Sequence, residues 1–444
     1  MEPKNLQAKT IIEALRKDRV LLVLENGELK VRGPKSKVTP EVLVQIRENK
    51  PALIQYLETE AAEDQVDFDG IFNKSGEAGL ISGHKALDFG LFYFGNATAM
   101  SEGYRLLMEG ARYADQNDFT AVWVPERHFH EFGGLYPSPS VLGSAVAATT
   151  ERIQIRAGSV VVPLHNPLRI AEEWAVIDVL SKGRVGIACA SGWQANDFVL
   201  MPDVWPERHK VLYENIEKVK RLWKGEAIEL KDGNDFLKDT RIYPKPVQPE
   251  LPLWLTSGGN IETFRSAGRL GMKLLTHLLG STVEELAPKI KAYREEYAAH
   301  NLPDGGDRVV VMLHTYMDET EAKTQAKAKK PFIEYLKTSV DLLKKLAESK
   351  GMGSDLSGLN EGDMEIMYEY AYNRYTSSAS LVGTVENRIS LLQQLSAIGV
   401  DEIACLIDFG VDSDSVIANL KNISRLKDAY HAQLQQASES LAEA

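Results

Sequence analysis

The chain has 444 residues, of which 44% are hydrophobic and 26% charged, and its formal net charge at pH 7 is −12. This length predicts two or three folding units with a sizeable core. The sequence holds no apolar run of about 18 residues and no secretory pattern near its start, which argues against a membrane span and for the cytoplasm. An acidic chain is also a poor ligand for nucleic acid. The two cysteines, Cys189 and Cys405, lie in apolar runs and predict buried thiols in a reducing compartment.

Residues 1–60 predict a small domain made of a helix, a hairpin and two short helices. Two apolar runs flank Asn26–Gly27, a strong signal for a tight hairpin turn, and Thr39 with Pro40 marks the start of the next helix. Such a short segment buries only a thin core, so we expect it to serve another protein, with the open edge of the hairpin able to accept a strand. A folded cap on the main domain is the alternative.

The order of these elements resembles the small N-terminal docking domains of hybrid peptide/polyketide synthetases, the type first described in a tubulysin synthetase. The resemblance covers residues 5–58, through VLLVLENGELKVRGP and TPEVLVQIRENKPALIQYL. It implies that residues 1–60 recognise the C-terminal tail of an upstream synthetase. Residues 61–85 have neither a helix nor a strand period, so we expect a linker there and a main domain over residues 86–435.

From Leu87 onward, short apolar runs alternate with amphipathic helical patterns. The predicted strands are Asp88–Phe94, Ala121–Val124, Ile153–Val160, Val185–Ala190, Leu253–Thr256, Lys273–Thr276, Val309–His314 and Ile403–Ile407. Strands that alternate with helices in this way predict an α/β fold, a (β/α)₈ TIM barrel. An open doubly wound sheet is the main alternative, but no G-x-G-x-x-G follows a strand. Residues 225–249 are expected to form a hairpin outside the barrel, and residues 331–378 are long enough for a lid.

Barrel active sites lie at the C-terminal ends of the strands, so the residues that follow each strand are the candidates. The second strand leads into Glu126, Arg127, His128, His130 and Glu131. Together with His277 and Asp408 after later strands, the H-x-H segment allows a metal-dependent hydrolase. The order of these residues differs from that of amidohydrolase barrels, and a hydrogen-bonded structural pair explains the two histidines better. We therefore predict no metal site.

A second candidate is the TSGGN segment, Thr256–Asn260, which opens the predicted helix 261–268. Glycines allow close approach, and the N-terminus of a helix presents free N–H groups to an anion. Arg208 begins another helix near a strand end, where its guanidinium could clamp a phosphate. Each feature alone is more often a helix cap or a surface arginine. Together they suggest a phosphorylated cofactor or substrate.

Residues 87–432 resemble the bacterial-luciferase-like flavin-dependent monooxygenases, and among these the branch of natural-product assembly lines that includes the mupirocin-pathway oxygenase. The stretches that carry the resemblance are DFGLFYF, VWVPERHFHEFGG, GSVVVPLHNPLRIAEEWAVIDVLSKGRVGIACASGW, LPLWLTSGGNIETF and LVGT.

Position by position, the resemblance implies a flavin pocket over the strand ends. Its catalytic group would be Glu126, Arg127 and His128, with Glu126 orienting the other two, and Gly158–Ser159 would be a cis peptide against the isoalloxazine ring. The remaining cofactor-binding residues implied are Ala190, Ser191 and Trp193 at the ring edge, and Arg208, Thr256, Ser257, Gly258 and Gly259 toward the phosphate. Arg127 in place of a luciferase histidine, and Ala190–Ser191 in place of a Cys–Arg pair, argue against simple transfer of the luciferase aldehyde mechanism.

The activity implied by the two resemblances is FMN-dependent monooxygenation through a C4a-peroxyflavin, with reduced FMN supplied by a separate flavin reductase. The implied substrate is an acyl or aminoacyl intermediate tethered to an acyl- or peptidyl-carrier protein in nonribosomal peptide/polyketide biosynthesis, either hydroxylated or oxidised by Baeyer–Villiger insertion. A homodimer is expected. The alternatives are a deazaflavin- or FMN-dependent dehydrogenase, the metal hydrolase, and a non-catalytic recruitment module.

Overall fold

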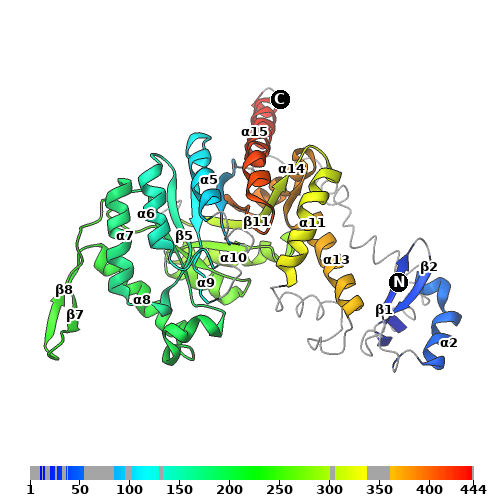
Figure 1. Ribbon diagram of the computed structural model, residues 1–444, viewed down its shortest axis with the longest axis horizontal. Coiled ribbons are helices and arrows are strands. Elements are labelled where there is room, and N and C mark those ends of the chain that lie inside the picture. The colour runs from blue at the N-terminus through cyan, green and yellow to red at the C-terminus, as the bar shows by residue number, and fades with distance from the viewer. Residues whose placement is uncertain are drawn as a thin grey trace. The chain divides into compact units, whose positions relative to one another are not determined.

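The computed structural model describes residues 11–12, 14–15, 21–25, 28–32, 37, 39–54, 85–95, 103–129, 134–300, 306–337 and 361–442 (Figure 1). It divides into two compact units, residues 1–83 with 336–374, and residues 84–335 with 375–444. Nearly all of the predicted linker, the turn Asn26–Gly27, His130, Glu131 and residues 338–360 of the predicted lid lie outside the described residues. The predicted boundaries at residues 60 and 85 therefore stay a prediction.

The head contains the predicted hairpin and the helix that follows it. Strand β1 (Leu21–Glu25) pairs antiparallel with β2 (Glu28–Arg32), and the pairing Glu25↔Glu28 leaves a two-residue connection. Helix α2 (Pro40–Glu48) begins after Thr39, whose Oγ1 accepts the Val42 N–H at 3.4 Å, so the predicted cap is confirmed. A small apolar core joins the elements through Ile11, Ile12, Leu15, Ile46 and Leu53.

The second unit is a closed parallel barrel, as predicted. Its strands are β3 (Asp88–Phe92), β4 (Ala121–Val124), β5 (Gln154–Val161), β6 (Val185–Ala190), β9 (Leu253–Thr256), β10 (Lys273–His277), β11 (Val309–Met317) and β13 (Glu402–Leu406). They lie in the order β10-β9-β6-β5-β4-β3-β13-β11, and the pairing of β10 with β11 closes the ring. Short β12 (Leu381–Gly383) pairs with the end of β11.

Helices follow the strands and cover the outside of the barrel (Figure 1). They are α5 (Arg105–Gln116), α6 (Pro139–Thr149), α7 (Pro167–Ser181), α8 (Arg208–Trp223), α9 (Ile261–Arg269), α10 (Val283–Ala299), α11 (Glu321–Lys337), α14 (Val385–Ala397) and α15 (Ser413–Ala442). Helix α13 (Glu361–Ser378) begins in the first unit and ends in the second. Side-chain caps at Asn166, Asn260 and Thr282 fix where α7, α9 and α10 begin. Strands β7 (Ile228–Lys231) and β8 (Leu237–Thr240) form the expected antiparallel hairpin, which projects from the barrel.

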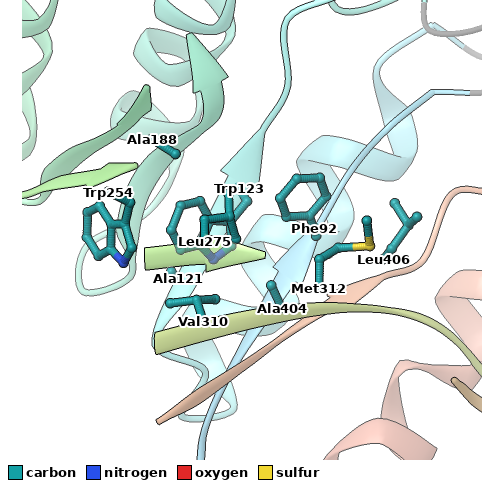
Figure 2. Close-up of a cluster of buried hydrophobic side chains, with 10 residues drawn as sticks. All are labelled: Phe92, Ala121, Trp123, Ala188, Trp254, Leu275, Val310, Met312, Ala404 and Leu406. Carbon is teal, nitrogen blue, oxygen red and sulfur yellow. The ribbon is translucent and has the colours of Figure 1, made fainter. Parts of the chain in front are cut away.

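Large and small side chains alternate inside the barrel. Figure 2 shows the cluster, which comprises Phe92, Ala121, Trp123, Ala188, Trp254, Leu275, Val310, Met312, Ala404 and Leu406. Side chains of a strand alternate between its two faces, so every second residue points into the barrel. The inward-pointing residues that follow this cluster along the chain therefore lie at the C-terminal ends of the strands, which form the mouth of the barrel. Toward the other end, Arg156 and Glu402 form a buried ion pair at 2.8 Å, and the Arg156 guanidinium lies 4.5 Å from the centre of the Trp254 ring.

Both cysteines are buried and free, as predicted, and burial raises the pKa of each thiol to about 12. None of the helices described here is long and apolar enough to cross a membrane.

Candidate active site

Glu126 lies just beyond the end of β4, at the mouth of the barrel, where its carboxylate accepts three hydrogen bonds. Its carboxylate is completely shielded from solvent, and Oε1 accepts hydrogen bonds from Nε2 of His128 at 2.7 Å and from Nε2 of His165 at 2.6 Å. The other oxygen, Oε2, accepts the backbone N–H of Val161 at 2.7 Å. Glu126 therefore links the end of β4 to the end of β5.

Glu126 and His165 shift each other's pKa in the directions that favour their charged forms. Burial alone would raise the pKa of Glu126, but hydrogen bonds from His128 and His165 hold it below its usual value. Burial likewise opposes protonation of His165, but the bond to Glu126 and its negative charge raise the pKa of that imidazole. Sequence reasoning did not assign His165 a role, although its place after the third strand, in PLHNP, was a usable signal.

The same three residues have the geometry of a metal-binding group, because their ligand atoms all lie within 4.8 Å of one another. Both imidazoles, however, donate to a single carboxylate oxygen, and the second oxygen is taken by a backbone N–H. Every polar contact of Glu126 is thus satisfied without an ion. The predicted absence of a metal stays a prediction.

Arg127 faces a different environment from its neighbours. Its side chain is buried, with the guanidinium 4.8 Å from the centre of the Phe94 ring and 5.4 Å from that of Trp193. Burial lowers the pKa of Arg127. The expectation that Glu126 orients both Arg127 and His128 is thus wrong for Arg127: the Glu126 carboxylate bonds to two histidines and the Val161 N–H, while Arg127 is held between aromatic rings.

Strand β5 carries the expected irregularity. The Gly158–Ser159 peptide is cis, and the register with β6 shifts between Gly158 and Val160. A Cβ on Gly158 would lie 2.7 Å from Cε2 of Phe92, so the space demands glycine. Ser159 Oγ lies 2.6 Å from Thr256 Oγ1, which joins this bulge to the end of β9.

The predicted ring-edge residues follow β6. Ala190 ends the strand opposite Val161, and Ser191 comes next. Trp193 is 55% exposed and contacts the site through Arg127.

Arg208 does not contact the glycine loop with which it was grouped. Its Nε donates to the Gly192 carbonyl at 3.3 Å, its Nη1 donates to the Trp205 carbonyl at 3.0 Å, and the guanidinium lies 4.0 Å from the centre of the Trp205 ring. No hydrogen bond links it to residues 256–259 in the described part of the chain. The prediction treated its position at the start of α8 as sufficient, whereas the side chain supports the segment after β6.

The glycine loop after β9 is well ordered by its own hydrogen bonds. Ser257 is buried, its Oγ accepts the Gly259 N–H at 3.3 Å, and its carbonyl accepts Thr276 Oγ1 at 2.9 Å. Gly259 has a φ of +110°, a backbone conformation that favours glycine. Asn260 then caps α9 by accepting the Glu262 N–H.

Asp408, one residue past the predicted last strand, is a buried carboxylate that sequence reasoning considered only as a strand-end residue of the rejected metal set. It accepts the N–H groups of Phe94 at 2.5 Å and Gly95 at 2.8 Å, and the hydroxyl of Tyr136 at 3.2 Å. Burial raises the pKa of Asp408 to about 7, although these hydrogen bonds oppose the shift. The carboxylate clamps the loop after β3, which carries Phe94 against Arg127.

An aromatic wall closes the mouth beside β11. His314 is fully buried, with its ring centre 4.5 Å from that of Tyr335 and Nδ1 3.1 Å from the hydroxyl of Tyr375. Burial lowers the pKa of His314 well below its usual value, so the ring is neutral. Tyr335 also lies 6.1 Å from Phe94, ring centre to ring centre. Residues of α11 and α13 thereby join the site.

Two family models match the chain. One, described as luciferase-like monooxygenase, matches residues 87–402, and the other, the TubC N-terminal docking domain, matches residues 9–59.

Individual relatives include both oxygenases and dehydrogenases. The oxygenase component of the flavin-dependent trigonelline monooxygenase of Acinetobacter baylyi is 26% identical over 330 residues, covering 72% of this chain and 88% of that protein. An F420-dependent glucose-6-phosphate dehydrogenase of Amycolatopsis mediterranei is 32% identical over 239 residues, covering 50% of this chain and 68% of the other. The oxygenating constituent of 3,6-diketocamphane monooxygenase from Pseudomonas putida, solved with FMN, aligns with a TM-score of 0.60 and 15% identity over 77% of this chain and 96% of that one. This last likeness shows the fold alone.

Proposed function

Because the chain belongs to the luciferase-like monooxygenase family of flavin-dependent enzymes and carries a TubC-type docking domain, we propose that it uses FMN to oxygenate an acyl or aminoacyl group tethered to a carrier protein. The observation that carries the proposal is the presence of both units in one chain. A docking domain brings an enzyme to an assembly line, where intermediates are thioesters on carrier proteins. The flavin would arrive reduced, from a separate flavin reductase.

The mouth of the barrel fits a flavin. Gly158 has no side chain, and Phe92 and Trp123 fill the space where its Cβ would stand, so the ring would lie against the opposite side of this backbone. The glycine loop and the first turn of α9 offer backbone N–H groups on the phosphate side. When bound, reduced FMN supplies the electrons that activate molecular oxygen.

The residues of this chain then have separable tasks. His128, whose Nε2 is held by Glu126, would hold or donate a proton at Nδ1. Arg127 offers a buried positive charge that would stabilise negative charge developing beside the ring. The aromatic side chains of Phe94, Trp193 and Tyr335 would exclude water from the oxygenation step.

The cofactor half of the proposal is tested by anaerobic titration with reduced FMN and, in parallel, with reduced F420. We expect tighter binding of FMN, and oxygen consumption when air is admitted. The sequence identity to the F420-dependent dehydrogenase supports a deazaflavin-dependent dehydrogenase as the second candidate. Preferential binding of F420 without oxygen consumption would favour that candidate and contradict the proposal.

The substrate half is tested with one acyl thioester offered in two forms, on a carrier protein of a synthetase whose C-terminal tail binds the docking domain and as the free pantetheine thioester. Intact-protein mass spectrometry on the carrier should show the gain of one oxygen atom, with the free thioester oxidised more slowly. Equal rates on the two forms would leave the docking domain without a role in substrate delivery and would contradict this half.

A further inference from the structure

Lys289 on α10 reaches the glycine loop after β9. A Cβ placed on Gly259 would lie 3.4 Å from Nζ of Lys289, so the ammonium stands directly over the face of that glycine. Gly259 has a φ of +110°, which favours glycine at this position. A side chain at this position would fill the space between the loop and the lysine.

Lys289 has no carboxylate within ion-pair distance among the residues that the structure describes. The cations around it are paired: Arg265 with Glu262, Arg269 with Glu296, and Lys291 with Glu295. The Lys289 ammonium instead faces the N-terminus of α9, which itself carries a partial positive charge. The ammonium and the N-terminus of α9 repel each other, whereas an anion bound between them would be attracted by both.

His277 lies beside the same loop. Its Nδ1 accepts the Leu279 N–H at 3.1 Å. Its Nε2 lies 3.8 Å from the position of a Cβ on Gly258. The first turn of α9 and the side chain of Lys289 therefore bring backbone N–H groups and an ammonium to one place.

We propose that Lys289 is the cation that binds the phosphate of FMN, in the role that sequence reasoning gave to Arg208. The inference rests on the proposed function, because it takes FMN as the cofactor. Arg208 is already committed to the carbonyls of Gly192 and Trp205, whereas Lys289 has no counter-charge among the described residues. Lysine binds phosphate as a point charge and needs only proximity, which the geometry provides.

The test compares equilibrium dissociation constants for FMN and riboflavin, which differ only in the phosphate, measured by quenching of flavin fluorescence on the full-length chain. We expect the wild-type protein to prefer FMN, and Lys289→Met to weaken FMN binding by about tenfold to a hundredfold while riboflavin binding stays unchanged. Lys289→Arg should retain most of the preference. Lys291→Met, on the same helix and paired with Glu295, is the matched control and should behave as wild type.

Three outcomes overturn the inference in distinguishable ways. If Lys289→Met keeps the wild-type preference while Arg208→Met abolishes it, the phosphate is bound by Arg208. If the wild-type protein binds FMN and riboflavin equally, no phosphate site exists, although the flavin function stands. If the wild-type protein binds neither flavin, the proposed function fails together with the inference. Circular dichroism and the melting temperature of Lys289→Met establish that a loss of binding is not a loss of fold.

Discussion

At the scale of single residues, the Glu126 network depends on charge as much as on position. The pKa of Glu126 is lowered, so its contribution to stability is present above the unfolded value near 4 and is lost as pH falls through the folded pKa. The pKa of His165 is raised, so its contribution is present below about 6.5 and is lost as pH rises through the folded pKa. The pair therefore stabilises the fold most between these two values.

Replacing Glu126 with glutamine removes the negative charge and leaves the shape. We expect Glu126→Gln to lower the pKa of His165, because burial then acts without the compensating carboxylate. Histidine resonances followed by NMR against pH give the measurement. An unchanged His165 titration would contradict the structure at this point.

Gly158 is the residue whose substitution the packing opposes most directly. Gly158→Ala places a methyl group 2.7 Å from Cε2 of Phe92 and 3.2 Å from Cβ of Trp123, so neighbouring core side chains must move. We expect a loss of about 1–3 kcal/mol in the free energy of unfolding, measured by urea denaturation. Gly233→Ala is the control, because a Cβ there meets nothing within 4 Å. Equal stability of the two variants would show that the space at Gly158 is open.

The sequence could predict those site residues that a local sequence pattern identifies. The adjacency of Glu126 and His128 is of this kind, whereas the cis peptide at Gly158–Ser159 was implied by the family resemblance. The contact of His165 with Glu126, and of Arg208 with Gly192, depends on which loops meet across the barrel mouth, and sequence spacing carries no information on that.

At the scale of elements, periodicity predicted the eight barrel strands to within a few residues, and the deviations have physical causes. Strand β11 runs to Met317 because its last residues pair with β12, a three-residue strand too short to give a periodic signal. Strand β3 ends at Phe92 because the N–H groups of Phe94 and Gly95 bond to Asp408. The helix starts were predictable where a cap residue marks them, as at Asn260.

Asp408 couples the ends of β13 and β3 in a pH-dependent way. Its pKa is raised to about 7, so its contribution to stability is fully present below the unfolded value near 4 and is lost as pH rises through about 7. Relative to Asp408→Asn, the wild-type protein should therefore lose about 1 kcal/mol of unfolding free energy between about pH 6 and about pH 8.

Urea denaturation of both proteins at the two pH values measures this difference. A constant difference between them would mean that Asp408 does not titrate in this range. Comparison with Asp408→Asn removes the contributions of all other groups, because these are common to both proteins.

At the scale of the whole molecule, the outer faces of α6 and α7 are unusually apolar for a surface. Val141 on α6 is 66% exposed, and Val176, Val179 and Leu180 on α7 are 44%, 42% and 55% exposed. Exposed apolar clusters mark interaction sites. We expect these helices to form the interface of the homodimer anticipated from the sequence.

The double variant Val179→Asp, Leu180→Asp should then convert a dimer to a monomer, because it buries two charges in the interface without partners. Size-exclusion chromatography with light scattering measures the mass. Phe236→Asp is the control, a still more exposed apolar residue on the β7–β8 turn, and should leave the mass unchanged. A wild-type protein that elutes as a monomer would contradict the expected dimer.

The proposed docking of residues 1–60 and oxygenation by the barrel meet in one prediction about FMN. In stopped-flow mixing, the anaerobic complex of the chain and reduced FMN is combined with oxygenated buffer and followed by flavin absorbance. We expect reoxidation in two phases, of which only the first depends on the concentration of oxygen. A single phase no different from that of free reduced FMN would contradict oxygenation with FMN.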